Sequence, residues 1–247
     1  MILNLLQLGR TSYASGLELQ RRLVEARHEG SIGNTLLLLE HPPVLTLGRN
    51  SSRSNIVADD EFLTYRGVEV HEINRGGDVT YHGPGQLVGY PILDLRSFSL
   101  DETGRRVGAV DYVRLLEEVL IRACADFGVQ TGRVTGRTGV WTLSGGSVQE
   151  KKIAAIGVHI SRGITSHGFA LNVTADLRDF ELIVPCGISD RQVTSLELEA
   201  DEALLPRLTL ENVASSIARH FGRVFNHQVL SLESLADLLP HEIIPIQ

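Results

Sequence analysis

The sequence predicts an α+β fold, a mainly antiparallel sheet with flanking helices packed on one face of it. Strand-like runs fill the middle of the 247-residue chain, and helix-like runs stand at its start, centre and end. A regular alternation of strand and helix, which a doubly wound parallel sheet requires, is missing. Runs of strands beside separate helices are typical of an antiparallel sheet in an α+β domain.

Apolar residues at helical spacing predict the helices. In the clearest one, 111–127, an apolar face is followed by a stop at Gly128. A last, short helix has Ser231 as its N-cap and Pro240 as its stop. The stretch after about Arg191 is expected to form a small appended lobe. The expected helices are Tyr13–His28 with Gly30 after it, Asp111–Phe127, Leu210–Phe225 and Ser231–Leu239.

Short apolar runs bounded by Gly, Pro or polar turn residues predict the strands. The first of them is stopped by His41-Pro42-Pro43. A turn is expected at Ser144–Ser147. The expected strands are Thr35–Glu40, Val44–Gly48, Val68–Ile73, Leu87–Leu95, Arg137–Leu143, Lys152–Ile160 paired with Phe169–Val173, and Leu182–Val184.

Composition and charge exclude several classes of protein. The formal net charge is -7 and no basic tail is present, which argues against a nucleic-acid binder. No apolar run approaches the ~20 residues that span a bilayer, and the N-terminus lacks the features of a signal peptide. Two cysteines, Cys124 and Cys186, do not make a disulfide framework. We therefore expect a cytoplasmic protein that works without membrane or nucleic acid.

The segment Arg75–Gln86 is rich in glycine and follows a predicted strand. Glycines let the backbone approach a ligand closely, and this loop also gathers Arg75, Thr80, Tyr81 and His82. No Gly-Lys-Ser/Thr follows, so it is not a phosphate-binding P-loop, and it does not open a helix as a dinucleotide fingerprint does. A tight turn with ordinary glycines remains the alternative.

Cys186 and Lys152 are candidates for nucleophilic chemistry. Cys186 stands between Pro185 and Gly187 just past an apolar run, whereas Cys124 lies on the apolar side of a predicted helix. A nearby cation favours the thiolate, so a lysine that opens a strand of small residues could serve such a cysteine. From the residues alone, a structural cysteine and a solvated lysine remain alternatives.

His167 begins the motif His167–Val173 and could donate to a carbonyl or a phosphate, although a histidine at a strand start is more often structural. The nine histidines show no spacing typical of zinc ligands. A Gly-x-Ser-x-Gly elbow is absent, which argues against a Ser-His-Asp hydrolase. We therefore expect neither a metal nor another cofactor.

Taken in order, these motifs and two more span Leu39 to Ile188, more than half of the chain. They are Leu39–Arg49, Arg75–Ile92, Gly136–Trp141, Lys152–Gly157, His167–Val173 and Pro185–Ile188. The ordered set resembles the lipoyl(octanoyl) transferase family, also called lipoate-protein ligase B. The resemblance implies the catalytic fold of biotin and lipoate protein ligases, which is related to class II aminoacyl-tRNA synthetases. It implies one octanoyltransferase domain over 1–247, with a ligase-like core at about 30–230.

The resemblance also assigns roles to residues. It implies that Cys186 carries the acyl group and that Lys152, rather than Lys151, is its partner. Secondary candidates are His167, Asn172 and Gly187. The implied acyl-binding residues are Arg75, Gly76, Gly77, Asp78, Val79, Thr80, Tyr81, His82, Ala155, Ile156, Gly157, Gly168, Phe169 and Ala170.

The implied reaction is transfer of an octanoyl group from acyl carrier protein, through a Cys186 thioester, to a lysine of a lipoyl carrier domain. The implied acceptors are the lipoyl domains of 2-oxoacid dehydrogenases and the glycine cleavage H protein. His159 and Gly163 depart from the residues common in the family, which leaves details of that hairpin and of partner docking open. Alternatives are an ATP-dependent lipoate ligase, a thioesterase with the same two residues, and a carrier-binding module without catalysis.

Overall fold

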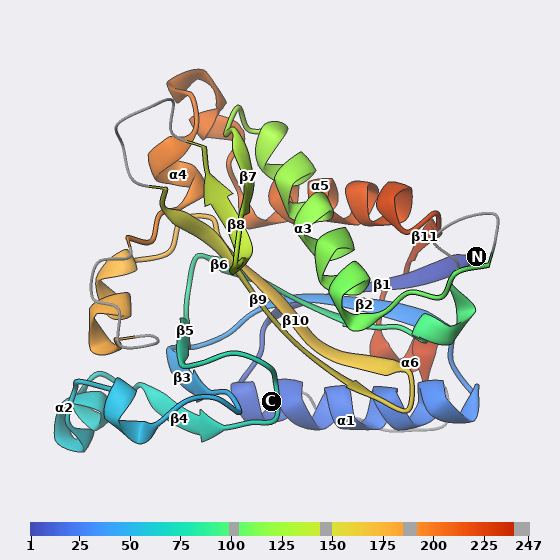
Figure 1. Cartoon of the computed structure of the whole chain (residues 1–247), viewed down its shortest axis with the longest axis horizontal. Helices are drawn as coiled ribbons and strands as arrows, with labels where there is room; N and C mark the ends of the chain where they lie inside the picture. The colour runs from blue at the N-terminus through green and yellow to red at the C-terminus, as the bar shows by residue number, and fades with distance from the viewer. Residues whose placement is uncertain (99–103, 144–149, 185–191, 240–247) are drawn as a thin grey trace.

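The computed structural model describes residues 1–98, 104–143, 150–184 and 192–239, and its main feature is an eight-stranded mixed sheet (Figure 1). The strand order is β11-β1-β2-β6-β10-β9-β8-β7, in which β1 pairs in parallel with both β11 and β2 while the later neighbours pair antiparallel. These strands are β1 Ile2–Arg10, β2 Asn34–Glu40, β6 Gln86–Ile92, β7 Thr131–Val134, β8 Arg137–Thr142, β9 Lys152–Ser161, β10 Ile164–Asn172 and β11 Gln228–Ser231. The predicted α+β class is confirmed.

Helices cover both faces of this sheet, so the expectation of helices on one face is wrong. In Figure 1, α1 lies below the sheet, and α3 and α5 lie above it. Strand β2 shows the reason. Leu36 and Leu38 pack in the core between the sheet and helices α3 and α5, while Leu37 and Leu39 pack in the core between the sheet and α1. Alternate residues of a strand face opposite sides, so an unbroken apolar run needs cover on both. The helices are α1 Tyr13–Glu29, α2 Asp60–Tyr65, α3 Ala109–Ala125, α4 Leu196–Glu199, α5 Leu210–Val224 and α6 Leu235–Leu238.

Helix α1 agrees with its prediction because its ends are capped locally. The Ser12 side chain accepts a hydrogen bond from the Ser15 backbone N–H at 3.2 Å, which satisfies a free donor of the first turn. Gly30 ends the helix with φ 79°, a conformation that glycine adopts without strain. The central helix begins two residues earlier than predicted and ends two residues earlier.

Three expectations for the second half of the chain are wrong. Leu182–Val184 is not a strand, because residues Leu177–Leu182 form a 3₁₀ helix and Ile183 makes only an isolated bridge to Ile56. Ser231 is the last residue of β11, and the helix after it begins at Leu235 with Ser234 as its N-cap.

Nor does the chain after Arg191 form an appended lobe. Helix α5 packs against α3 in the main core, and β11 joins the edge of the large sheet. The predicted turn at Ser144–Ser147 lies outside the described residues.

A second sheet of three strands stands beside the first. It consists of β4 Glu69–Glu72, β3 Val44–Leu47 and β5 Thr80–His82, in the order β4-β3-β5. Its own apolar cluster includes Leu45, Tyr81 and Leu182. The glycine-rich segment Arg75–Gln86 follows β4 and contains β5, so this small sheet positions that segment.

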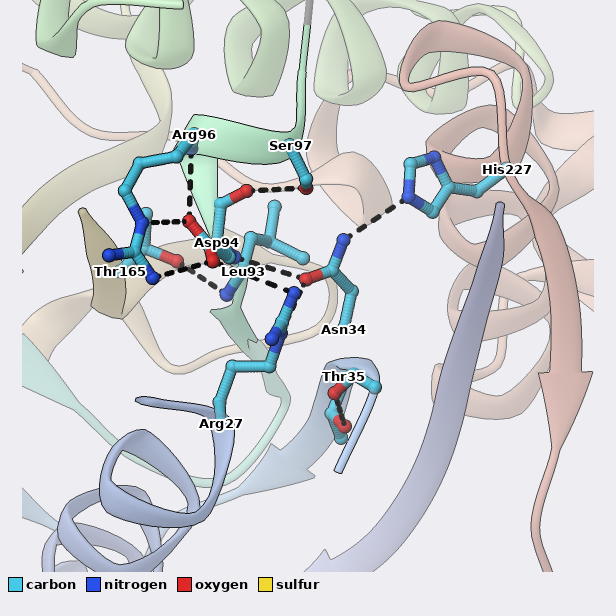
Figure 2. Close-up of polar contacts among 10 residues, drawn as sticks. Arg27, Asn34, Thr35, Leu93, Asp94, Arg96, Ser97, Thr165 and His227 are labelled. Carbon is cyan, nitrogen blue, oxygen red and sulfur yellow. Dashed lines mark hydrogen bonds and ion pairs between the residues drawn. The ribbon is translucent and has the colours of Figure 1, made fainter. Parts of the chain in front are cut away.

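A polar network closes one end of β2 and β6 (Figure 2). Asn34 Oδ1 accepts hydrogen bonds from Arg27 Nε and from the Asp94 backbone N–H, each at 3.0 Å. The Asn34 amide also contacts His227 Nε2 at 3.3 Å. Since Asn34 is only 5% exposed, these bonds satisfy polar groups that water does not reach.

Candidate active site

A cavity of about 330 Å³ lies between the large sheet and the glycine-rich segment. Three residues of the large sheet lie side by side along its floor: Ala170 pairs with Val88 on β6 and with Ala155 on β9. Their small or aliphatic side chains leave an apolar channel that suits a hydrocarbon chain.

Lys152, the first residue of β9, lines this cavity. Its Nζ stands 5.3 Å from the centre of the Trp141 ring, a position that stabilises an ammonium through the ring face. The side chain of the neighbouring Lys151 points elsewhere, because its Nζ forms an ion pair with Glu199 Oε1 at 3.1 Å. The two adjacent lysines therefore face different surroundings, and only Lys152 lines the cavity.

The chain on both sides of the segment 185–191 reaches the cavity wall. Before it, the Val184 backbone N–H donates to Asn55 O at 2.8 Å, and Ile183 lines the cavity. After it, Gln192 O accepts from the Lys152 backbone N–H at 3.0 Å, and Val193 lines the cavity. Cys186 and Gly187 fall within that segment and lie outside the described residues.

Two buried histidines, His82 and His167, line the cavity, and the ring of a third, His41, lies beside His82. Burial lowers the pKa of His82 to about 3, and nearby His41 and Arg75 add to this effect. Burial likewise lowers the pKa of His41 and of His167 to about 4. These rings are therefore neutral at pH 7. His167 Nε2 donates to Asn74 Oδ1 at 2.9 Å, which fixes the tautomer of that ring.

Arg75 is a buried cation in the same region, only 7% exposed. Its guanidinium donates to Thr46 O at 2.8 Å and to Thr46 Oγ1 at 2.9 Å. These bonds tie the glycine-rich segment to β3 and hold it over β9, where the Gly76 N–H donates to Val158 O at 3.0 Å. Burial lowers the pKa of the guanidinium, which still leaves it charged at neutral pH.

The structure brings most of the residues assigned by resemblance to this cavity. Gly76 and Tyr81 do not line it. The Tyr81 ring packs in the cluster of the small sheet, and its hydroxyl donates to Asp179 Oδ2 at 2.6 Å. Among the assigned binding and secondary residues, the cavity is lined by Arg75, Gly77, Asp78, Val79, Thr80, His82, Ala155, Ile156, Gly157, His167, Gly168, Phe169, Ala170 and Asn172.

Sequence reasoning missed several cavity residues. Tyr13 comes from the first turn of α1, and Gln192 and Val193 follow the Cys186 segment. Nothing in their local sequence indicated a site, because tertiary packing alone brings them there. The Gly136–Trp141 motif held a usable signal, since Arg137 and Trp141 both line the cavity beside Lys152.

Within the described ranges, no group of three or more His, Cys, Asp or Glu residues is arranged to hold a metal ion. No helix in the same ranges is both long and apolar enough to cross a membrane.

Comparison with known proteins places the chain in a family. Residues 12–222 match the family described as lipoyl protein ligase A/B catalytic domain. An octanoyltransferase from Acidobacterium capsulatum is 78% identical over 240 residues, which cover 97% of each chain. An octanoyltransferase from Koribacter versatilis is 57% identical over 239 residues, covering 97% of this chain and 90% of the other.

Solved structures agree on the fold. Lipoate-protein ligase A bound with ATP superposes with a TM-score of 0.69 at 17% identity, over 96% of this chain and 92% of the other. A bi-partite lipoate protein ligase from Thermoplasma acidophilum gives a TM-score of 0.65 at 15% identity, over 95% and 88%. The expected ligase-type catalytic fold is confirmed. The chain belongs to the lipoyl(octanoyl) transferase family and is an acyltransferase.

Proposed function

We propose that this enzyme moves an octanoyl group from acyl carrier protein to a lysine of a lipoyl domain, with Cys186 as the intermediate acyl carrier. The relatives named octanoyltransferase support the octanoyl group and protein lipoylation. The observation that carries the proposal is the position of Lys152, which lines a cavity whose wall includes residues on both sides of the Cys186 segment.

The first half-reaction is a thioester exchange. The Cys186 thiolate attacks the carbonyl carbon of the octanoyl thioester, a new carbon–sulfur bond forms, and the carrier's sulfur leaves as a thiolate. The Lys152 ammonium stabilises the attacking thiolate and gives a proton to the departing one. The octanoyl chain lies along Val88, Ala155 and Ala170. Burial of an apolar chain contributes about 0.8 kcal/mol per methylene, so this channel also selects for chain length.

The second half-reaction forms an amide. The amine of the acceptor lysine attacks the Cys186 thioester, Lys152 accepts the proton that the amine loses, and the Cys186 thiolate leaves. The energy of the amide bond comes from the donor thioester, so ATP takes no part. The acceptor is a lipoyl domain of a 2-oxoacid dehydrogenase or the glycine cleavage H protein.

The test compares two donors with one acceptor. The purified enzyme is incubated with a lipoyl domain and one of two donors: octanoyl-carrier protein, or free octanoate with ATP and Mg²⁺. The intact mass of the acceptor is then measured by mass spectrometry. We expect the octanoyl mass only with the carrier donor. Octanoylation from the free acid and ATP would make the enzyme a ligase, and release of free octanoate faster than transfer would make it a thioesterase.

Two cysteine variants complete the test. Cys186→Ala is expected to abolish transfer. Cys124→Ala is the matched control, because Cys124 lies on α3, fully buried in the core, and burial raises the pKa of its thiol to about 12. Equal loss in both variants, or full activity of Cys186→Ala, would contradict the covalent route.

A further inference from the structure

Asn172 is a buried amide at the end of β10, with both of its polar atoms bonded inside the protein. It is 4% exposed. Its Oδ1 accepts from Gln86 Nε2 at 2.8 Å, and its Nδ2 donates to the backbone oxygen of Thr194 at 2.9 Å. The bond to Thr194 joins β10 to the chain that follows the Cys186 segment.

The direction of these bonds is fixed by the Thr194 carbonyl, which can only accept. Asn172 must therefore turn its nitrogen to Thr194 and its oxygen to Gln86, so the Gln86 nitrogen donates to Asn172. Gln86 Oε1 is then left to accept from His82 Nδ1 at 2.6 Å. Because all three side chains are at least nine-tenths buried, reversing any amide would leave polar groups unpaired.

Thr194 is in turn paired with the backbone of Lys152. The Thr194 N–H donates to Lys152 O at 2.9 Å, and the Lys152 N–H donates to Gln192 O at 3.0 Å. Both backbone groups of Lys152 thus depend on the segment Gln192–Thr194. Asn172 holds that segment from the side of β10.

We infer that Asn172 is a positioning residue, which sets the place of Lys152 by clamping Gln192–Thr194 against β9. The inference rests on the proposed function, in which the Lys152 ammonium lowers the pKa of the Cys186 thiol. The attraction between two charges depends on their separation, so a displaced Lys152 stabilises the Cys186 thiolate less. The residues along which the acyl chain lies, Val88, Ala155 and Ala170, stay in place, so donor binding should change little.

The experiment uses the full-length protein with Asn172→Ala and with Asn172→Asp, which keeps the size of the side chain but cannot donate to Thr194 as a carboxylate. Asn34→Ala is the matched control. Asn34 is a buried asparagine in the polar network of Figure 2. It precedes Thr35, which pairs with Ile92 at one end of β6, whereas Asn172 pairs with Gln86 at the other end. Unfolding midpoints of all variants show how much stability each one loses.

Two readouts separate positioning from stability. The rate of Cys186 alkylation by iodoacetamide against pH gives the pKa of its thiol, and Cys124 stays silent because it is fully buried. Steady-state transfer gives kcat and the KM for octanoyl-carrier protein separately.

We expect both Asn172 variants to raise the pKa of the Cys186 thiol toward the value of about 8.5 of free cysteine. We expect kcat to fall by about tenfold to a hundredfold, as small misplacements of catalytic groups do, with KM within about twofold of wild type. Asn34→Ala should lose stability and keep the wild-type alkylation profile and kcat.

Wild-type profiles and kcat in whichever Asn172 variant folds would overturn the inference, as would equal shifts in Asn34→Ala. These results differ from a failure of the proposed function, in which the wild-type enzyme itself would not acylate Cys186.

Discussion

Gly139 offers a sharp test of how closely Lys152 is held. It lies on β8 with φ 115°, and a Cβ placed there would stand 2.5 Å from Ala154 O and 2.8 Å from Lys152 Cε. The carbonyl belongs to the paired strand β9, so it cannot withdraw without opening the β8–β9 pair. Gly139→Ala should therefore displace the Lys152 side chain from its position on the cavity wall.

The expected cost has two parts. The backbone conformation costs about 1–3 kcal/mol for a residue other than glycine. The contacts with Ala154 and Lys152 add about 1–3 kcal/mol, as overpacking does. Gly30→Ala isolates the first part, because Gly30 has φ 79° and nothing lies within 4 Å of its added Cβ.

Urea unfolding and single-turnover acylation of Cys186 make the comparison. We expect Gly139→Ala to lose more stability than Gly30→Ala and to acylate at least about tenfold more slowly, since a displacement of about 1 Å can cost a hundredfold. If folded Gly139→Ala acylates as fast as Gly30→Ala, then the position of Lys152 does not limit the reaction.

Three further predictions concern the channel, the two lysines and the buried histidines. Ala170→Leu should fill part of the channel and favour hexanoyl over octanoyl donors, by about fourfold for each methylene that no longer fits. Competition assays that measure the mass of the acylated acceptor test this. An unchanged chain-length preference would contradict the assigned channel. Lys152→Met should abolish transfer, while Lys151→Met should lose only the partly exposed ion pair with Glu199, about 1 kcal/mol or less, and keep its kcat. The folded-state pKa values of His41 and His167, about 4, lie below the usual 6.5, so the unfolded chain binds more protons in this range and stability should fall as pH drops from about 6.5 toward 4. Urea unfolding at a series of pH values should show a weaker slope for His41→Gln than for wild type, and an equal slope would contradict the neutral buried ring.

The fold class and most helices could be predicted because local signals determine them. Ser12 and Gly30 cap α1, and periodic apolar residues mark α3 and α5. The small parallel part of the sheet could not be predicted, because β1 carries no turn signal of its own and becomes a strand through pairing with β2 and β11. Leu182–Val184 has the composition of a strand, but Leu182 is the last residue of a 3₁₀ helix.

The candidate site divides in the same way. Residues within ordered motifs, such as Arg75, Lys152 and Ala170, could be assigned by resemblance, and the cavity contains them. Tyr81 stands in the densest motif yet turns to Asp179, because alternation along β5 directs it into the small sheet's cluster. The bond from Asn172 to Thr194 joins residues 22 positions apart through a side chain and a backbone oxygen, a contact that no sequence pattern encodes.

The covalent intermediate is the central claim, and trapping it is the most direct measurement. The enzyme is mixed with octanoyl-carrier protein in the absence of acceptor, quenched in acid within seconds, digested and mapped by mass spectrometry. The account predicts one octanoyl group on the peptide that contains Cys186, removed by neutral hydroxylamine and lost when a lipoyl domain is added before the quench. An unmodified Cys186 under conditions in which the lipoyl domain becomes octanoylated at full rate would contradict it.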